Sequence, residues 1–224
     1  MKSVLLTRSE SANIQLRAEL DKLGYELLEC SLIDYELQDF DPLELNNYTN
    51  IIITSIFAAN NIPSAPSKGM LAWVVGEKSA MILEKKGYKI KFFARDAETL
   101  KKQIPSYIYE NTLYLSSDHI TTNMPTAVSR RIFYKVTYRE SLSSSQILRY
   151  KQGIDYILLY SRNCANTLVK LILETDLVNY LESTTVIAIS SKVKVVVQQY
   201  FSNIMVCPGA DSMLEYLKKN DKKD

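Results

Sequence analysis

The sequence predicts an α/β protein of two domains, each with a parallel sheet flanked by helices. Two observations lead to this fold class. Short apolar runs alternate with amphipathic stretches along the chain, and four of these runs stop at a small polar residue where the next helix begins. The four junctions stand at Thr54-Ser55, Gly76, Tyr160-Ser161 and Ser190. Because parallel sheets bind ligands outside the carboxyl ends of their strands, the junctions predict a ligand cleft between the domains.

The first strand and helix occupy the start of the chain. Val4 to Leu6 form an apolar run, and Ser9 is placed to cap a helix that Gly24 ends. The spacing predicts that the apolar face of this helix contains Ala12, Leu16, Leu20 and Leu23. A second strand is expected over 27–33, and the acidic stretch 34–41 that follows is typical of a connector.

The middle of the chain shows the same alternation. It predicts strands at 51–53, 73–76, 90–93 and 113–115, with a surface loop rich in Pro and Ser at 63–67. Helices are expected between Gly76 and Gly87, from the cap Asp96 to about Ile104, and from Pro125 to about Arg130.

The last third of the chain returns to the first domain. Residues 133–139 alternate with period two and lead into a run of serines, which predicts an extended strand leaving the second domain. Strands at 157–159 and 186–189 follow. Val193, Val196, Val197 and Tyr200 then fall at helical spacing, and Asp211 is placed to cap a final helix through Leu217. The predicted organisation is a discontinuous domain of 1–34 plus 143–224, an inserted domain of 40–133, and two paired linker strands at 35–39 and 134–142.

Composition excludes several classes of function. Of the 224 residues, 46% are hydrophobic and 23% are charged, as in an ordinary globular protein. The 27 Lys and Arg residues exceed the 25 Asp and Glu residues by only two, which is too few for a protein whose affinity rests on a phosphate backbone. We therefore expect no nucleic-acid partner. Only three apolar residues precede Arg8, which is too short a run for a signal peptide or a membrane span, so no membrane partner is expected.

The cysteines and the histidine give no sign of a metal site. Cys30, Cys164 and Cys207 are odd in number and far apart, which predicts reduced thiols and a cytoplasmic location. His119 is the single histidine, and no cluster of ligands stands at metal spacing. The sequence thus predicts neither a metal nor a cofactor.

Six stretches of the chain carry a resemblance to a known family. They are Leu5 to Ser9, Tyr48 to Ser55, Val74 to Ala80, Val136 to Tyr138, Tyr160-Ser161 and Pro208 to Leu214. In this order and spacing the chain resembles uroporphyrinogen-III synthase over nearly its whole length. The resemblance implies two α/β domains joined by a two-stranded β-ladder, with the substrate between them. It also implies a cofactor-free lyase of heme biosynthesis, which closes the linear tetrapyrrole hydroxymethylbilane to uroporphyrinogen III with inversion of ring D and loss of water. We expect such an enzyme to be a monomer.

The pyrroles themselves drive this reaction, so the protein mainly needs to fold a flexible polyanion and supply a proton donor. The resemblance matches Tyr138 to the family's linker tyrosine, whose phenol is protonated at neutral pH. The alternative for Tyr138 is an ordinary sheet tyrosine. Helix N-termini, short hydroxyls and basic side chains suit the substrate carboxylates. The predicted binding residues are Arg8, Thr54, Ser55, Gly76, Ser79, Ser161, Ser190, Ser191 and Lys192.

Each of these binding residues has a plainer interpretation. A serine at a junction can be only a helix N-cap, and Arg8 can be only an exposed ion pair. The fourth junction also departs from the family, because the chain reads Ser190-Ser191-Lys192-Val193 where a glycine and then a hydroxyl residue are usual. Two other functions therefore stay open. One is a weakly active or inactive protein of the same fold that binds a tetrapyrrole or another small ligand, and the other is an unrelated two-domain sensor of small ligands.

Overall fold

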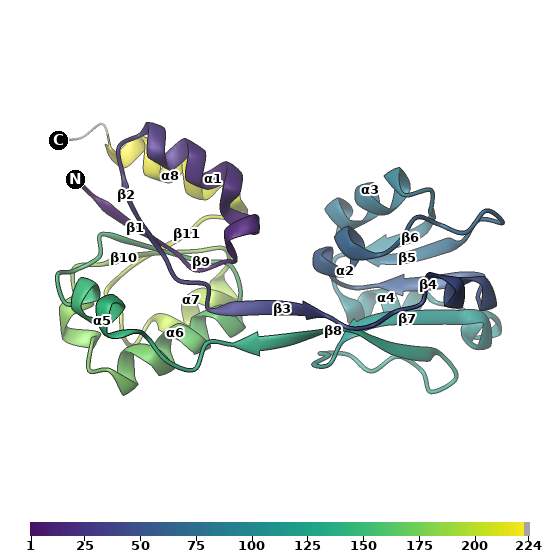
Figure 1. Cartoon of the computed structure of the whole chain (residues 1–224). Helices are drawn as coiled ribbons and strands as arrows, with labels where there is room; N and C mark the ends of the chain where they lie inside the picture. Colours follow the sequence, from purple (N-terminus) through teal and green to yellow (C-terminus); the bar gives the residue numbers. More distant parts are fainter. Residues whose placement is uncertain (222–224) are drawn as a thin grey trace. The chain divides into compact units, whose positions relative to one another are not determined.

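The computed structural model describes residues 1–221, apart from the side chains of Ser11 and Asp221. Contacts between residues divide the chain into two compact units (Figure 1). Unit 1 comprises Met1–Asp34 and Thr137–Asp224, and unit 2 comprises Tyr35–Val136. Each unit is built on its own sheet, so each is described by itself.

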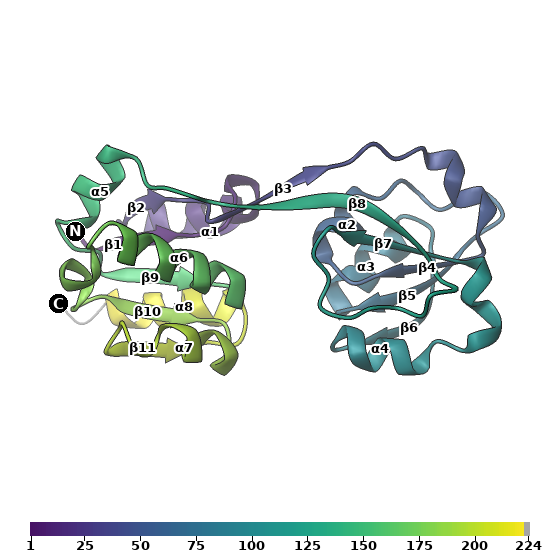
Figure 2. The same ribbon diagram turned by 90° about the horizontal axis from the view of Figure 1, so that it is seen from below.

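The sheet of unit 1 contains five strands in the order β11-β10-β9-β1-β2, and all neighbours are parallel (Figure 2). The strands are β1 (Ser3–Leu6), β2 (Glu26–Glu29), β9 (Tyr156–Leu159), β10 (Thr185–Ala188) and β11 (Asn203–Val206). In the register of the sheet, Leu6 lies beside Leu158, and Leu159 lies beside Ala188. The carboxyl ends of β1, β9 and β10 therefore stand next to one another.

Helices cover both faces of this sheet (Figure 1). On one face, α1 (Glu10–Lys22) and α8 (Ala210–Asp221) bury Leu16, Leu20, Met213 and Leu217. The opposite face carries α5 (Ser144–Tyr150), α6 (Arg162–Glu174) and α7 (Ser191–Val197). Helix α6 alternates buried and exposed positions with helical spacing, which is why it packs flat against the strands.

The sheet of unit 2 contains six strands in the order β3-β8-β7-β4-β5-β6. They are β3 (Ile33–Leu37), β4 (Asn50–Ile53), β5 (Leu71–Val75), β6 (Lys89–Ala94), β7 (Thr112–Ser117) and β8 (Ser129–Tyr138). The five strands from β8 to β6 are parallel. Strand β3 runs antiparallel to β8, because the backbone N–H of Gln38 bonds the carbonyl of Phe133 while that of Arg139 bonds the carbonyl of Leu32. The chain thus leaves unit 1 within β3 and returns within β8.

Alternate residues of the central strands of unit 2 face two separate cores. Ile51 and Ile53 pack with Ala58 and Leu83 under α2 (Ile56–Asn61) and α3 (Glu77–Lys85). Between them, Ile52 points to the other face, where it joins the core that α4 (Ala97–Gln103) covers. Strands buried on both faces read as continuous apolar runs, which explains the run of isoleucines at this position.

The predicted fold class, α/β with parallel sheets flanked by helices, is confirmed. The three cysteines are free and buried, as their spacing predicts. Asp96 also caps α4 as predicted, since its carboxylate accepts a hydrogen bond from the backbone N–H of Thr99 at 2.8 Å. Among the described residues, no helix has both the length and the apolar character needed to cross a bilayer.

Several local predictions are wrong. The strand expected over 27–33 ends at Glu29, and a separate strand starts at Ile33. Between them the chain bends, because the backbone N–H groups of Cys30 and Leu32 donate to the carbonyls of Leu6 and Thr7. Pro125 heads a single turn rather than a helix, and β8 already begins at Ser129 beside β7.

Two helix predictions are wrong at single residues, and one helix boundary differs. Ala12 is exposed on α1, and the polar Asn13 is buried in its place. Tyr200 lies beyond the end of α7. Asp211 lies inside the first turn of α8, which starts one residue earlier and extends to Asp221.

Candidate functional site

The carboxyl edge of the unit 1 sheet brings together three of the predicted binding segments. Arg8 follows β1, Ser161 follows β9 and Ser190 follows β10, and these three strands are neighbours. The hydroxyl of Thr7 is fully buried and donates to the carbonyl of Leu158 at 2.5 Å, which ties the end of β1 to β9. A fixed edge of this kind holds the start of each following helix in place.

Tyr138 reaches the same edge from the end of β8. Its side chain is 36% exposed, and its phenol oxygen accepts a hydrogen bond of 3.0 Å from the side-chain amide of Asn163, in the first turn of α6. The two residues border a hollow of about 330 Å³. The rest of its lining is Asn166, Thr167 and Lys170, all from α6. Tyr138 is therefore a phenol at the rim of an open hollow beside a helix N-terminus.

Arg8 lies on the other face of the edge, against Tyr160. The guanidinium stands over the Tyr160 ring, 4.3 Å from the ring centroid, and donates to the carbonyl of Ala12. The phenol oxygen of Tyr160 and Nε of Arg8 are shielded from solvent without a hydrogen-bond partner among the described residues. Burial raises the pKa of Tyr160 to about 12, against a smaller opposing effect of Arg8. Arg8 is thus held by an aromatic ring rather than by the carboxylate of an exposed ion pair.

The two helices that start at this edge are capped differently. Ser161 is the N-cap of α6, and its hydroxyl accepts from the backbone N–H of Cys164 at 3.0 Å. Ser190 is the N-cap of α7 but makes no side-chain cap bond. Ser191 and Lys192 follow it in the first turn and are exposed.

Unit 2 presents a corresponding edge at the ends of β4 and β5. The hydroxyl of Thr54 shares a 2.9 Å hydrogen bond with the phenol of Tyr114, whose pKa burial raises. Ser55 caps α2, with its oxygen 3.1 Å from the backbone N–H of Phe57. Both residues are half-buried. Thr54 is therefore already engaged with its own unit, and so is the hydroxyl of Ser55.

Gly76 starts α3 with φ at 87°, a region that favours glycine. Its backbone N–H bonds the carbonyl of Ala94, and no cap side chain lies there. Ser79, predicted with it as a binding residue, is only 3% exposed and lies under the first turn of the helix. The structure thus leaves Gly76 at the edge and shields the Ser79 side chain from solvent.

Sequence reasoning missed Asn163, and it did not foresee what holds the end of β7. Ser116 and Ser117, which end that strand, are buried. Arg130 of β8 donates to the Ser116 hydroxyl at 2.8 Å and to the Ser117 carbonyl at 2.8 Å. An arginine from the neighbouring strand thus fixes this end of the sheet.

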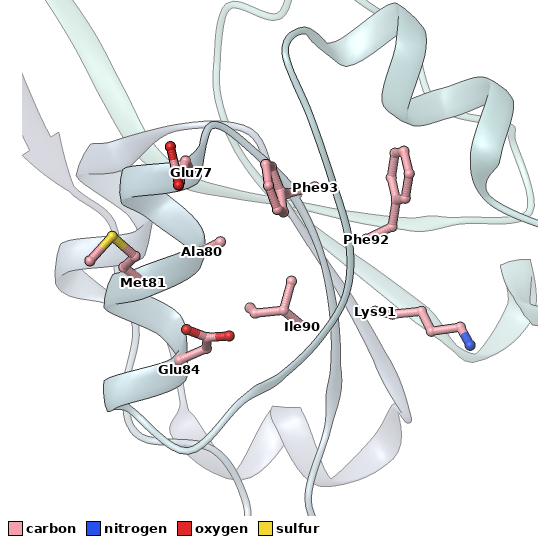
Figure 3. A pocket seen from close by; sticks show the side chains of 8 residues that line it. All are labelled: Glu77, Ala80, Met81, Glu84, Ile90, Lys91, Phe92 and Phe93. Atoms are coloured by element: carbon pink, nitrogen blue, oxygen red, sulfur yellow. The ribbon is translucent and has the colours of Figure 1, made fainter.

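A larger hollow of about 620 Å³ lies elsewhere in unit 2, between α3 and the edge strand β6 (Figure 3). Figure 3 shows Glu77 and Glu84 on the helix, with Ile90 and Phe93 on the strand beside it. The two carboxylates outnumber the one cation of the lining, Lys91, so the net charge at this hollow disfavours an anionic ligand. It is therefore a poorer candidate for a polyanion site than the edges of the two sheets, in spite of its size.

The described residues contain no group of three or more His, Cys, Asp or Glu side chains arranged to hold a metal ion. What the edges offer is a phenol, hydroxyls, backbone N–H groups at helix starts, and a few cations. This set suits anion binding and proton donation. Fold and site together define a two-unit α/β protein whose strand ends are candidate anion-binding sites and which has a tyrosine as its candidate acid.

The chain belongs to the uroporphyrinogen-III synthase family. The family described as Uroporphyrinogen-III synthase HemD matches residues 14–215. The chain is also 35% identical to a Rickettsia prowazekii (strain Madrid E) protein named uncharacterized protein RP474, in a match that covers 99% of this chain and all of the relative.

Two solved structures of uroporphyrinogen-III synthases share the fold. The synthetase of Helicobacter pylori 26695 is 16% identical, with a TM-score of 0.58 and coverage of 98% of this chain and 100% of the other. A mutant synthase of Thermus thermophilus is 13% identical, with a TM-score of 0.62 and full coverage of both chains. At these identities the likeness establishes the architecture.

Proposed function

We propose that the protein is an active uroporphyrinogen-III synthase, a lyase that converts hydroxymethylbilane to uroporphyrinogen III and water. One observation carries the proposal beyond family membership. The tyrosine that matches the family's linker tyrosine, Tyr138, places its hydroxyl at the carboxyl edge of a parallel sheet, at the rim of an open hollow. A proton donor at a ligand-binding edge is the group that the first step of this reaction needs.

In the proposed mechanism, Tyr138 donates its proton to the terminal hydroxyl of the substrate, which leaves as water. The resulting azafulvene cation closes on a substituted pyrrole carbon to give a spiro intermediate. That intermediate fragments and closes again with ring D inverted, and the proton released at the final closure returns to the phenolate. The protein's part is to hold the folded chain and to exclude the direct closure that gives isomer I.

Carboxylate binding is proposed for the residues that the structure leaves accessible at the edges. In unit 1 these are Ser190, Ser191, Lys192 and the start of α6 at Ser161. Arg8 contributes positive charge from its place over Tyr160. In unit 2 the candidates are Thr54, Ser55 and the backbone at Gly76. Ser79 is left with a packing role.

The test is the isomer formed from hydroxymethylbilane. The substrate is generated enzymatically in the presence and absence of the purified protein, the products are oxidised to porphyrins, and isomers I and III are separated. We expect isomer III to dominate with the protein and isomer I without it. If isomer I alone appears at every protein concentration, the synthase proposal is wrong.

A second candidate function keeps the same site without turnover, and the departure at Ser190-Ser191-Lys192-Val193 favours it. A binding protein would give isomer I only, yet it would still quench the fluorescence of added uroporphyrin III at micromolar concentrations. The two assays together therefore distinguish an enzyme from a binding protein.

A further inference from the structure

The hydrogen bond between Asn163 and Tyr138 joins two parts of unit 1 that are far apart in sequence. Asn163 Nδ2 donates to Tyr138 Oη at 3.0 Å across a separation of 25 residues. A phenol oxygen has one proton to donate and lone pairs that accept. Because the amide occupies a lone pair of the phenol oxygen, it restricts the orientation of the phenol group.

We propose that Asn163 is a positioning residue for Tyr138, which orients the phenol and stabilises the phenolate left after proton transfer. This inference rests on the proposed function, because it assigns a role in that reaction. The amide acts in two ways. It fixes the direction of the O–H group, and it offers a hydrogen-bond donor that favours the charged form of the phenol.

The backbones on both sides of this contact are anchored. Asn163 is the second residue of α6, its carbonyl accepts from the Thr167 hydroxyl at 3.0 Å, and the next residue, Cys164, is buried. On the other side, the neighbours of Tyr138 bond to the backbone around the start of β3. The Thr137 hydroxyl donates to the carbonyl of Asp34 at 3.4 Å. The backbone N–H of Arg139 donates to the carbonyl of Leu32 at 3.0 Å.

The start of α6 adds to this effect. Partial positive charge at a helix N-terminus stabilises a nearby anion, and α6 is 13 residues long with a capped first turn. The residues that line the hollow continue along the helix to Lys170. A substrate hydroxyl that enters the hollow therefore lies beside both the phenol and the amide that holds it.

Aspartate at position 163 reverses the hydrogen bond, and so provides a sharp test. Its carboxylate has the shape of the amide but only accepts, so in Asn163→Asp it accepts a hydrogen bond from the phenol O–H group and turns that group towards residue 163 instead of the substrate. An acidic residue in the first turn of a helix stabilises that helix, so this variant should fold. A role in packing alone predicts wild-type activity for Asn163→Asp.

We expect Asn163→Asp to lower kcat for isomer III by about tenfold, and Asn163→Ala by about threefold, within the range of general acid catalysis. The matched control is Asn203→Asp, which makes the same charge change at an exposed position on the opposite edge of the sheet. Its kcat should stay within about twofold of the wild type. An added negative charge can raise KM for a polyanion, so the comparison is made at saturating substrate.

A second readout does not depend on activity. The side-chain amide signals of Asn163 in the ¹⁵N-labelled protein are assigned by their loss in Asn163→Ala, and they should shift in Tyr138→Phe. Unshifted amide signals, or a kcat of Asn163→Asp equal to that of the wild type, overturn the positioning role. A wild type that forms isomer I alone overturns the proposed function and with it this role in catalysis, whereas the amide signals still report the hydrogen bond.

Discussion

Two phenols stand at the carboxyl edge of the unit 1 sheet, and their surroundings differ. Tyr160 packs into the core under α1 and α8, where burial raises its pKa to about 12 and Arg8 covers its ring. Tyr138 lies on the α6 side with 36% of its surface exposed. Of the two, only Tyr138 combines access to solvent with a place at an open hollow, so it is the better candidate for the proton donor.

Removal of the Tyr138 hydroxyl should therefore slow the reaction without abolishing it. We expect Tyr138→Phe to lower kcat for isomer III by about tenfold, because a positioned weak acid contributes modestly and the pyrroles drive the remaining steps. Steady-state rates with enzymatically generated hydroxymethylbilane provide the measurement. Tyr107→Phe is the control, since Tyr107 is 84% exposed on unit 2. A loss of less than about twofold in Tyr138→Phe would remove Tyr138 from the mechanism.

Single residues were the hardest feature to predict from the sequence. Tyr138 could be chosen because it matches a family position, but Asn163 gives no signal, since an asparagine in the first turn of a helix is usually a surface residue. Its role depends on a partner 25 residues away that only the fold brings near. Ser79 differs in the opposite way, because its place at a predicted junction favours a binding role while its position in the first turn of α3 leaves it only 3% exposed.

At the scale of elements, the third and fourth junctions provide a natural comparison. Both α6 and α7 start at a serine with extended backbone, yet only the Ser161 hydroxyl bonds a backbone N–H of its helix. An N-cap bond contributes about 1 kcal/mol, because it satisfies a donor that the helix leaves unpaired. A comparison of Ser161 with Ser190 therefore isolates the stability contributed by the cap hydrogen bond from other effects of a serine at this edge.

Ser161→Ala should reduce the free energy of unfolding by about 1 kcal/mol, and Ser190→Ala by less than about 0.5 kcal/mol. Urea denaturation followed by far-UV circular dichroism measures both. If the two variants lose the same free energy, the difference in capping seen here does not govern the stability of the two helices.

The sequence predicts the ends of helices and strands correctly where local hydrogen bonds determine them. It fails where pairing between strands distant in sequence determines them. Asp96 marks the start of α4 through its own hydrogen bond, and the sequence is sufficient to find it. Around Pro125, the local signal for a helix loses to the pairing of β8 with β7, which begins at Ser129. The break between Glu29 and Ile33 depends on carbonyls at the end of β1, and no local pattern reveals them.

At the scale of the molecule, the sheet of unit 1 depends on two segments that unit 2 separates along the chain. Strands β1 and β2 come from the N-terminal segment, and the other three come from the C-terminal one. The two segments are joined at the amino edge by Asp155, which accepts from the backbone N–H of Ser3 at 2.7 Å. Arg149 of α5 also binds Glu26 of β2 through two hydrogen bonds, at 2.8 and 2.5 Å. Electrostatic contacts between the N-terminal and C-terminal segments of unit 1 therefore contribute to the stability of the protein.

The pair of Glu26 and Arg149 predicts a pH dependence of stability. The hydrogen bond from Arg149 lowers the pKa of Glu26 in the folded protein, and the positive charge of Arg149 lowers it further. The folded state therefore favours the ionised form of the Glu26 carboxyl group. A carboxyl group with a lowered pKa in the folded state stabilises the protein above its unfolded pKa of about 4.3, and that stabilisation is lost as the pH falls through the folded pKa. The contribution should be below about 1 kcal/mol, since 37% of the Glu26 side chain is exposed.

We therefore expect Glu26→Gln to be less stable than the wild type at pH 7 and nearly equal to it at the acid end of the range, where Glu26 is protonated in both states. Urea denaturation at a series of pH values measures the difference. Glu215→Gln, at an exposed position on α8 of the same unit, controls for the loss of one charge. A difference that stays constant with pH would mean that Glu26 acts through packing rather than charge. In that case, the attachment of the N-terminal strands would rest on β1 pairing with β9 and on Asp155.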